Sequence, residues 1–141
     1  MSNKIVAYMM RVDEESGQIY QGYFREIDNT LKAKQDYVGY NQPHSLIQVI
    51  GLTDSIDVIM NDEGKLKGYP VNRAILDEDG QILDFIVGNC LCVRHNDEGE
   101  FISIKESDIE LIEKHLIPIL LVTEKGILTV PADTLPEYKE V

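Results

Sequence analysis

Apolar and polar residues alternate along much of the chain, and clusters of Gly, Asn, Asp and Ser separate the alternating segments. Alternation with a period of two indicates a strand that buries one face, and turn residues between two such strands indicate a hairpin. The segments with this pattern are residues 4–11, 19–27, 45–52, 55–61, 82–87, 89–94, 101–104 and 119–130. They predict hairpins that turn in DEESGQ, around Thr53 and Asp54, and at residues 124–126.

Two other segments have the spacing of amphipathic helices. In the first, Asn29 or Thr30 is a suitable N-cap for a helix over residues 31–38, and Gly39 suits the left-handed position that follows a helix. In the second, residues 106–116 begin with acidic and hydroxyl side chains and continue with apolar residues on one face. The pattern as a whole predicts an α+β fold, in which a largely antiparallel (mixed) sheet built from hairpins carries two short helices.

The chain length favours one domain. A sequence of 141 residues, 43% hydrophobic and 27% charged, is long enough to enclose one core, and no long linker divides it. Residues 82–87 and 89–94 are expected to be adjacent strands, joined or bent at Gly88. We therefore expect a single domain over residues 1–141, with a C-terminal tail that frays from about residue 132 because its apolar periodicity is weak.

Net charge changes the range of expected partners. Lys and Arg total 13 against 25 Asp and Glu, which gives a formal charge of -12. A field of this sign repels nucleic-acid phosphates and anionic membrane surfaces, so we expect neither as a direct partner. The first residues lack the long apolar core of a signal peptide, and no apolar run approaches the roughly 20 residues that span a bilayer. The expected location is the cytoplasm.

Candidate chemistry is densest between Gly68 and Arg94, where polar side chains are mixed with strand-forming ones. The stretch IMNDEGKLKGYPVNRAILDEDGQILDFIVGNCLCV contains an Asn-Asp-Glu-Gly turn, then Pro70, Asn72 and Arg73 in a Pro-x-Asn-Arg motif, then an apolar strand that ends in Gly. It resembles a family of small uncharacterised proteins carried by bacteriophages and plasmids of Gram-positive bacteria, whose motif is Leu-Pro-x-Asn-Arg. The resemblance covers about residues 31–101, and Tyr69 replaces the Leu.

The resemblance implies a function only by its context. Small proteins of such elements often counter host defences, and several unrelated ones sequester nucleotide-derived immune signals as oligomers. A pocket for an anionic nucleotide needs Arg for phosphate, an aromatic face for the base and amides for the ribose. The residues of this stretch that meet those needs are Tyr69, Asn72, Arg73, Asn89 and Arg94. They form the expected ligand-binding site.

A structural interpretation of the same motif stays open. In this interpretation Pro70 and Asn72 brace a rigid turn, with the Asn side chain capping the backbone. Arg73 then pairs with one carboxylate of the segment DEDG at residues 77–80. The chain has four arginines in all, at positions 11, 25, 73 and 94, so any arginine that binds a phosphate must be one of them.

Other residues suggest chemistry that we weigh as secondary. Cys90 and Cys92 face one side of a strand, and with His95 they suggest a soft-metal site, but a closed zinc site needs four ligands and His95 points the other way. A thiol nucleophile would need a lowered pKa, so packing is the favoured role. His115 suits a cap at a helix end. Aromatic residues concentrated in the first third of the sequence suggest core or a subunit interface: Tyr8, Tyr20, Tyr23, Phe24 and Tyr37. We expect no catalytic residue, metal or cofactor.

Three functions follow as hypotheses. The first is a non-catalytic, homo-oligomeric protein that counters host defence by sequestering a small anionic nucleotide-like signal. The second is an acidic DNA mimic, or another protein-interaction inhibitor, that occupies the basic groove of a host defence nuclease. A small hydrolase is the third.

Overall fold

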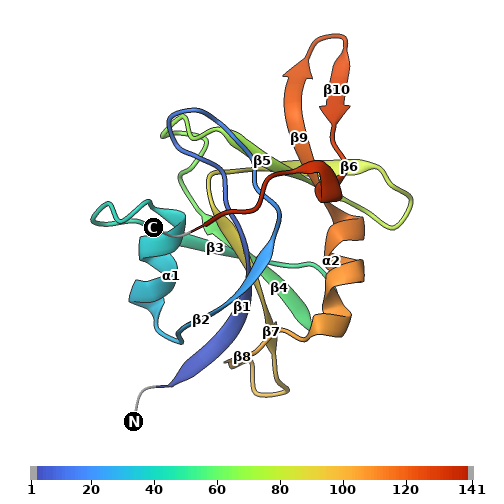
Figure 1. Ribbon diagram of the computed structural model, residues 1–141. Helices are drawn as coiled ribbons and strands as arrows, with labels where there is room; N and C mark the ends of the chain where they lie inside the picture. Colours follow the sequence, from blue (N-terminus) through green and yellow to red (C-terminus); the bar gives the residue numbers. More distant parts are fainter. Residues whose placement is uncertain (1–2, 140–141) are drawn as a thin grey trace.

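The computed structural model describes residues 3–139, except the side chains of residues 121–123. Its strands form two antiparallel sheets, and two helices lie on opposite sides of the molecule (Figure 1). The strands of the first sheet are β1 (Lys4–Met10), β2 (Tyr23–Asp28), β3 (Ile47–Gly51), β4 (Ile56–Asn61), β7 (Cys90–His95) and β8 (Phe101–Ile102). Those of the second are β5 (Val71–Leu76), β6 (Ile82–Val87), β9 (Leu116–Thr123) and β10 (Gly126–Thr129). The α+β class predicted from the sequence is confirmed.

Order within the sheets places β7 centrally and β2 at an edge. The first sheet runs β2-β1-β7-β4-β3, with β8 paired to β7, and the second runs β10-β9-β5-β6. The helices are α1 (Leu31–Val38) and α2 (Ile109–His115), and short 3₁₀ turns cover Glu106–Asp108 and Ala132–Thr134. Every described strand pairing is antiparallel. The predicted hairpins β1–β2, β3–β4 and β9–β10 are all present.

Local chemistry explains how α1 begins and ends. The Thr30 side chain accepts a hydrogen bond from the Ala33 N–H at 3.1 Å, so Thr30 is the N-cap of the two candidates, Asn29 and Thr30, that the sequence offered. The prediction that Gly39 adopts a left-handed conformation is wrong, because its φ is -105°. Left-handed φ values occur instead at Tyr40 and Asn41, 53° and 62°. Gly39 is needed for space, since a Cβ there would lie 1.9 Å from the Ser45 Oγ.

The prediction of a single sheet is also wrong, because consecutive strands β6 and β7 belong to different sheets. Gly88 lies between them with a φ of 77° and makes the change of direction possible. A Cβ at Gly88 would also come within 2.9 Å of the Tyr69 ring. Alternating polarity does not distinguish a bend within one sheet from a crossing between two sheets, because both strands show the same pattern.

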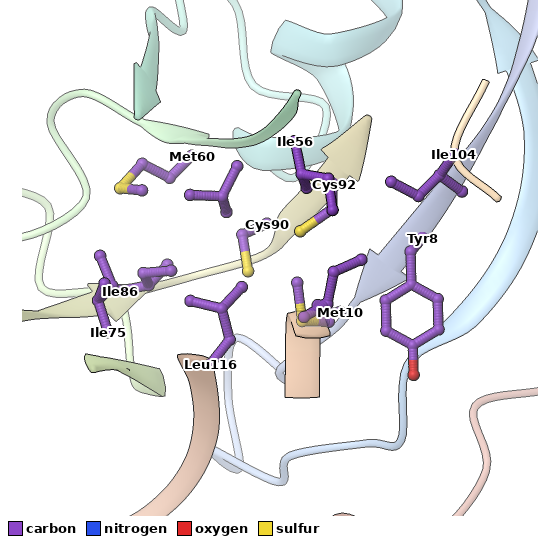
Figure 2. Close-up of a cluster of buried hydrophobic side chains, with 12 residues drawn as sticks. Tyr8, Met10, Ile56, Met60, Ile75, Ile86, Cys90, Cys92, Ile104 and Leu116 are labelled. Atoms are coloured by element: carbon purple, nitrogen blue, oxygen red, sulfur yellow. The ribbon is translucent and has the colours of Figure 1, made fainter. Parts of the chain in front are cut away.

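The larger part of the core lies between the two sheets. Figure 2 shows Cys90 and Cys92 pointing from β7 into a cluster of apolar side chains that both sheets and α2 contribute. The buried members of this cluster are Tyr8, Met10, Ile56, Val58, Met60, Ile75, Ile86, Cys90, Cys92, Ile104, Ile112 and Leu116. Burial of these side chains is the main force that holds the sheets together.

The other face of the first sheet is covered only in part. Leu91 and Val93 of β7 pack there with Ala7, Met9 and Val38, the last of which belongs to α1. Since α1 has eight residues, a length of about 12 Å, it covers only part of this face. A groove lies beside α1 and is lined in part by residues of β1 and β2.

The C-terminal tail contacts the first hairpin through Leu135, Pro136 and Tyr138, and fraying from about residue 132 stays a prediction. Leu135 is buried beside Val12 and Ile19, and the Gln21 N–H donates to the Pro136 oxygen at 3.1 Å. The described part of the tail therefore runs across the molecule toward α1 (Figure 1). Weak periodicity did not reveal this because a single apolar residue, Leu135, anchors the segment.

No helix within residues 3–139 has the length and apolar character needed to cross a membrane.

Candidate functional site

Asn72 and Arg73, at the centre of the predicted site, lie buried where the two sheets meet. The Asn72 amide donates to the backbone oxygens of Met10 at 3.0 Å and Gly88 at 2.9 Å, and so ties β5 to β1 and to the crossing between the sheets. Arg73 donates to the Asn72 Oδ1 at 2.6 Å and to the Tyr20 oxygen at 2.9 Å. Its exposure is 2%, and burial lowers its pKa.

Asn89 extends the same arrangement. Its Oδ1 accepts the Val12 N–H at 3.0 Å, and its amide donates to the Tyr37 oxygen at 3.2 Å. The structure thus brings Asn72, Arg73 and Asn89 together, but their described hydrogen bonds end on the protein itself. We call these three residues the sheet junction. Their side chains brace the backbone, but Asn72 and Arg73 lie in strand β5 and not in the rigid turn of the structural interpretation, and Arg73 binds neutral oxygens and not the carboxylates of residues 77–80.

The other two predicted residues lie apart from the junction's hydrogen bonds. Tyr69 is buried, with its ring centroid 5.1 Å from that of Tyr40 in an edge-to-face contact. Arg94 donates twice to Asp108, from Nε and Nη2, each at 2.7 Å. This contact holds the pKa of Asp108 below its usual value. Two of the five N–H groups of Arg94 are thus engaged by a carboxylate of the protein.

The cysteines have surroundings typical of packing residues. Both thiols are fully buried, and burial raises the pKa of Cys90 to about 12 and that of Cys92 well above its usual value. His95 lies on the opposite face, with its Nδ1 2.8 Å from Asp57 Oδ2. Among residues 3–139, no group of three His, Cys, Asp or Glu is arranged to hold a metal ion. His115 Nδ1 lies 2.9 Å from the Leu76 oxygen, so it connects α2 to β5.

A groove of about 790 Å³ lies beside α1, on the open part of the first sheet. Met9 and Ile27 contribute to its lining from β1 and β2, Ala33 and Tyr37 from α1, and Tyr138 from the tail. This volume is within the range of pockets that hold small ligands and cofactors. Of the five predicted site residues, Asn89 alone lines it.

Cationic and aromatic side chains meet in this groove. Arg11 follows β1 directly, and its guanidinium carbon lies 4.4 Å from the centre of the Tyr138 ring. Its Nε is buried and has no hydrogen-bond partner among the described residues. Arg25, from β2, is a second guanidinium in the lining. The rings that line the groove belong to Tyr23, Tyr37, Tyr40 and Tyr138.

Carboxylates also line the groove, and three of them have a partner among the described residues. The six are Asp13, Glu14, Glu15, Glu26, Asp28 and Asp36. Asp13 accepts the Ser16 N–H at 2.8 Å, which lowers its pKa. Asp28 lies 3.4 Å from Lys4 Nζ, and Asp36 lies 2.9 Å from Lys32 Nζ. The groove is therefore mixed in charge, with its guanidinium groups set among rings.

Two consecutive residues at the groove have strained backbones. Tyr40 and Asn41 have φ values of 53° and 62°, which cost energy for residues other than Gly. The Tyr40 hydroxyl donates to the Val12 oxygen at 2.7 Å, and this bond holds the turn in place. Burial raises the pKa of Tyr40, so its hydroxyl stays protonated as a donor. Strain of this kind is concentrated at functional sites.

Sequence reasoning missed the groove because its residues come from five separate segments of the chain. Two signals pointed to it: the aromatic residues concentrated in the first third of the chain, and the short list of four arginines. Neither signal shows that Arg11 and Tyr23 share a cavity, since that depends on the β1–β2 pairing. Tyr138 carried no signal at all.

Comparison with protein families places the chain. A family model described as a domain of unknown function, DUF3846, matches residues 9–117, which is more than half of the sequence. The chain belongs to the DUF3846 family. The expectation of an uncharacterised family is confirmed, while the phage and plasmid origin and the Leu-Pro-x-Asn-Arg motif stay predictions.

The DUF3846 region includes the sheet junction and most of the groove. It begins in β1 and ends in β9, so Arg11 and Tyr23 lie inside it and Tyr138 lies outside. No curated protein and no solved structure matches the chain. The family description names no activity.

Proposed function

We propose that this DUF3846 protein binds a small anionic, ring-containing ligand of the nucleotide class in the groove beside α1 and withholds it without catalysis. In the cell it would act as an accessory protein of a phage or plasmid, countering host defence by sequestering a nucleotide-derived immune signal in the bacterial cytoplasm. The site is the groove around Arg11 and not the sheet junction, whose side chains are committed to the protein itself.

The observation that carries this proposal is the buried Arg11 Nε, which lacks a described hydrogen-bond acceptor. A buried donor without a partner costs roughly 1–3 kcal/mol, more when it is charged. A phosphate oxygen is the acceptor that a guanidinium prefers. The tyrosine rings beside Arg11 offer the stacking faces that a nucleobase needs. Phosphate and base therefore find their partners in the same groove.

The acidic residues of the groove restrict the ligand but do not exclude it. Asp28 and Asp36 each lie beside a lysine that partly offsets their charge, and Asp13 accepts a backbone N–H. At physiological salt, exposed carboxylates farther than about 8 Å are largely screened. The buried and raised-pKa thiols supply no ready nucleophile, which favours binding over catalysis.

The groove opens beside β2, an edge strand of the first sheet. We expect a second copy of the chain to associate along this edge and close the groove, because enclosed pockets for small ligands often lie between subunits. Sedimentation of the protein with and without ligand measures this association.

Isothermal titration calorimetry against cyclic ADP-ribose and a panel of cyclic dinucleotides tests the proposal. We expect saturable binding, with the ligand recovered unchanged when the protein is denatured. Arg11→Gln should weaken binding at least tenfold, since a hydrogen bond to a charged group contributes about 1.5–3 kcal/mol. The matched control is Lys67→Gln, which removes one positive charge from an exposed loop outside the groove.

The outcomes separate the hypotheses. If no member of the panel binds the wild-type protein, the sequestration proposal is wrong. If the ligand is recovered as a cleaved product, the protein is a hydrolase. If Arg11→Gln and Lys67→Gln weaken binding equally, the ligand responds to net charge and does not contact the groove.

A second candidate function is supported by the charge of -12. Acidic turns such as residues 77–80 and 96–100 are largely exposed, and they give the surface a negative field suited to the basic groove of a nuclease. Association of this kind weakens strongly with salt. Binding to a basic defence nuclease that is unchanged between 50 mM and 500 mM salt would argue against the DNA mimic.

A further inference from the structure

One end of the groove is a slot that holds an aromatic ring of the chain itself. The Tyr138 ring is stacked on Tyr23, with centroids 5.7 Å apart and an interplanar angle of 23°. It meets Tyr20 edge to face at 5.5 Å, and the Arg11 guanidinium lies over it at 4.4 Å. We call the space bounded by Arg11, Tyr20 and Tyr23 the ring slot. Its geometry suits a planar π system.

Tyr138 and the rest of the tail are held by different kinds of contact. The tail is anchored by Leu135, which is buried beside Val12 and Ile19. The Gln21 N–H then donates to the Pro136 oxygen. Tyr138 lies two residues beyond this bond and is partly exposed. The interactions described for its side chain are all contacts of the ring. Its side chain can therefore leave the slot while the anchor stays in place.

The Tyr138 ring interacts with the charge of the Arg11 guanidinium but leaves its Nε–H donor without a described acceptor. A cation over an aromatic face uses the charge of the guanidinium, but a ring face gives no oxygen to the buried Nε. A ligand that carries both a planar ring and an anionic oxygen would keep the first interaction and add the second. Such a ligand competes well with Tyr138 for the same space.

We infer that the ring slot is the subsite for the planar base of the ligand, and that Tyr138 is an internal occupant which the base displaces. This inference rests on the proposed nucleotide-class function and adds where the base binds and what must move. The ligand's phosphate then lies next to the Arg11 Nε. The apparent affinity then equals the intrinsic affinity multiplied by the fraction of time that Tyr138 leaves the slot empty.

Variants of Tyr138 test the inference by calorimetry with adenosine 5′-monophosphate, adenosine and ribose 5-phosphate, alongside any ligand found in the panel. Tyr138→Ala empties the slot, so we expect adenosine 5′-monophosphate to bind it about tenfold more tightly than the wild type. Tyr138→Phe keeps the ring and should bind as the wild type does. Ribose 5-phosphate, which has no base, should gain much less from Tyr138→Ala than the nucleotide does.

A fluorescent variant provides an independent measurement. The chain contains no Trp, so Tyr138→Trp places a single indole in the slot. Addition of adenosine 5′-monophosphate should shift its emission to the red as the ring moves into water, whereas ribose 5-phosphate should leave it unchanged. This measurement also serves if Tyr138→Ala fails to fold.

Each outcome supports or overturns the inference. Tighter binding by Tyr138→Ala together with the red shift supports it. Nucleotide binding that is unchanged or weaker in Tyr138→Ala, with no shift for Trp, shows that residue 138 is a fixed wall; the subsite is then wrong and the proposed function stands. Absence of binding by the wild type and by both variants overturns the proposed function and the subsite together.

Discussion

The sheet junction and the groove each contain a guanidinium beside amides and aromatic rings, yet only one of them is arranged to receive a ligand. Arg73 is 2% exposed and donates to Asn72 and to the Tyr20 oxygen. Arg11 lies over the Tyr138 ring with its Nε buried and without a described partner. The same residue type thus braces the fold in one region and leaves bonding capacity in the other.

The difference shows what a polar motif means when its surroundings are known. Asn72 reaches Met10 and Gly88, so the Pro-x-Asn-Arg segment fastens the second sheet to the first at the point where the chain crosses between them. A buried polar side chain needs such partners, because desolvation without a hydrogen bond costs several kcal/mol. The motif is therefore informative about the fold and has no described opening for a ligand.

Asn72→Ala, a variant of the sheet junction, should show the largest effect on stability. It removes the donors to two buried backbone oxygens and the closest partner of Arg73. We expect the free energy of unfolding to fall by about 3 kcal/mol, measured by urea denaturation. Gln42→Ala, an exposed amide outside the junction, should change it by less than about 0.5 kcal/mol. Equal effects of the two variants would contradict a bracing role for Asn72.

Alkaline pH should have the next largest effect, through the thiols next to the junction. Asn72 Nδ2 lies 3.8 Å from the Cys90 sulfur. Burial raises the pKa of Cys90 from 9.0 to about 12, so the unfolded chain loses this proton at a lower pH than the native protein does. Stability from this thiol is therefore complete below about pH 9 and is lost as pH rises toward 12.

Urea denaturation at pH 8, 9 and 10 measures this loss. Well above pH 9, each thiol should contribute a decrease that approaches about 1.4 kcal/mol per pH unit. Cys92, whose pKa burial also raises, acts in the same direction. Cys90→Ala should reduce the slope. A stability that stays constant from pH 8 to pH 10 would contradict the burial of these thiols.

Arg94→Ala should show the smallest of the three effects on stability. It tests an arginine that lies outside both the sheet junction and the groove. Its two hydrogen bonds to Asp108 are partly buried, with side-chain exposures of 23% and 6%, so their loss should cost about 2 kcal/mol. Lys65→Ala removes an exposed ion pair with Asp84 and should cost less than about 1 kcal/mol. Both variants should bind ligand as the wild type does; weaker binding by Arg94→Ala alone would return Arg94 to the site.

The sequence by itself determined the local elements of this protein. Alternating apolar residues identified the three hairpins, and the Thr30 side chain marked the start of α1, because strand alternation and helix capping depend on residues close together in the chain. Strand alternation also placed the Cys90 and Cys92 side chains on one face, and their burial agrees with the packing role expected for them.

Only the tertiary structure decided which polar residues are buried and which line a cavity. The sequence cannot show that β6 and β7 belong to different sheets, and this crossing is what buries Asn72 and Arg73. Nor can it show that the tail returns to place Tyr138 on Arg11, 127 residues earlier in the chain. Such contacts depend on long-range burial of a few anchors such as Leu135, and no local pattern encodes them.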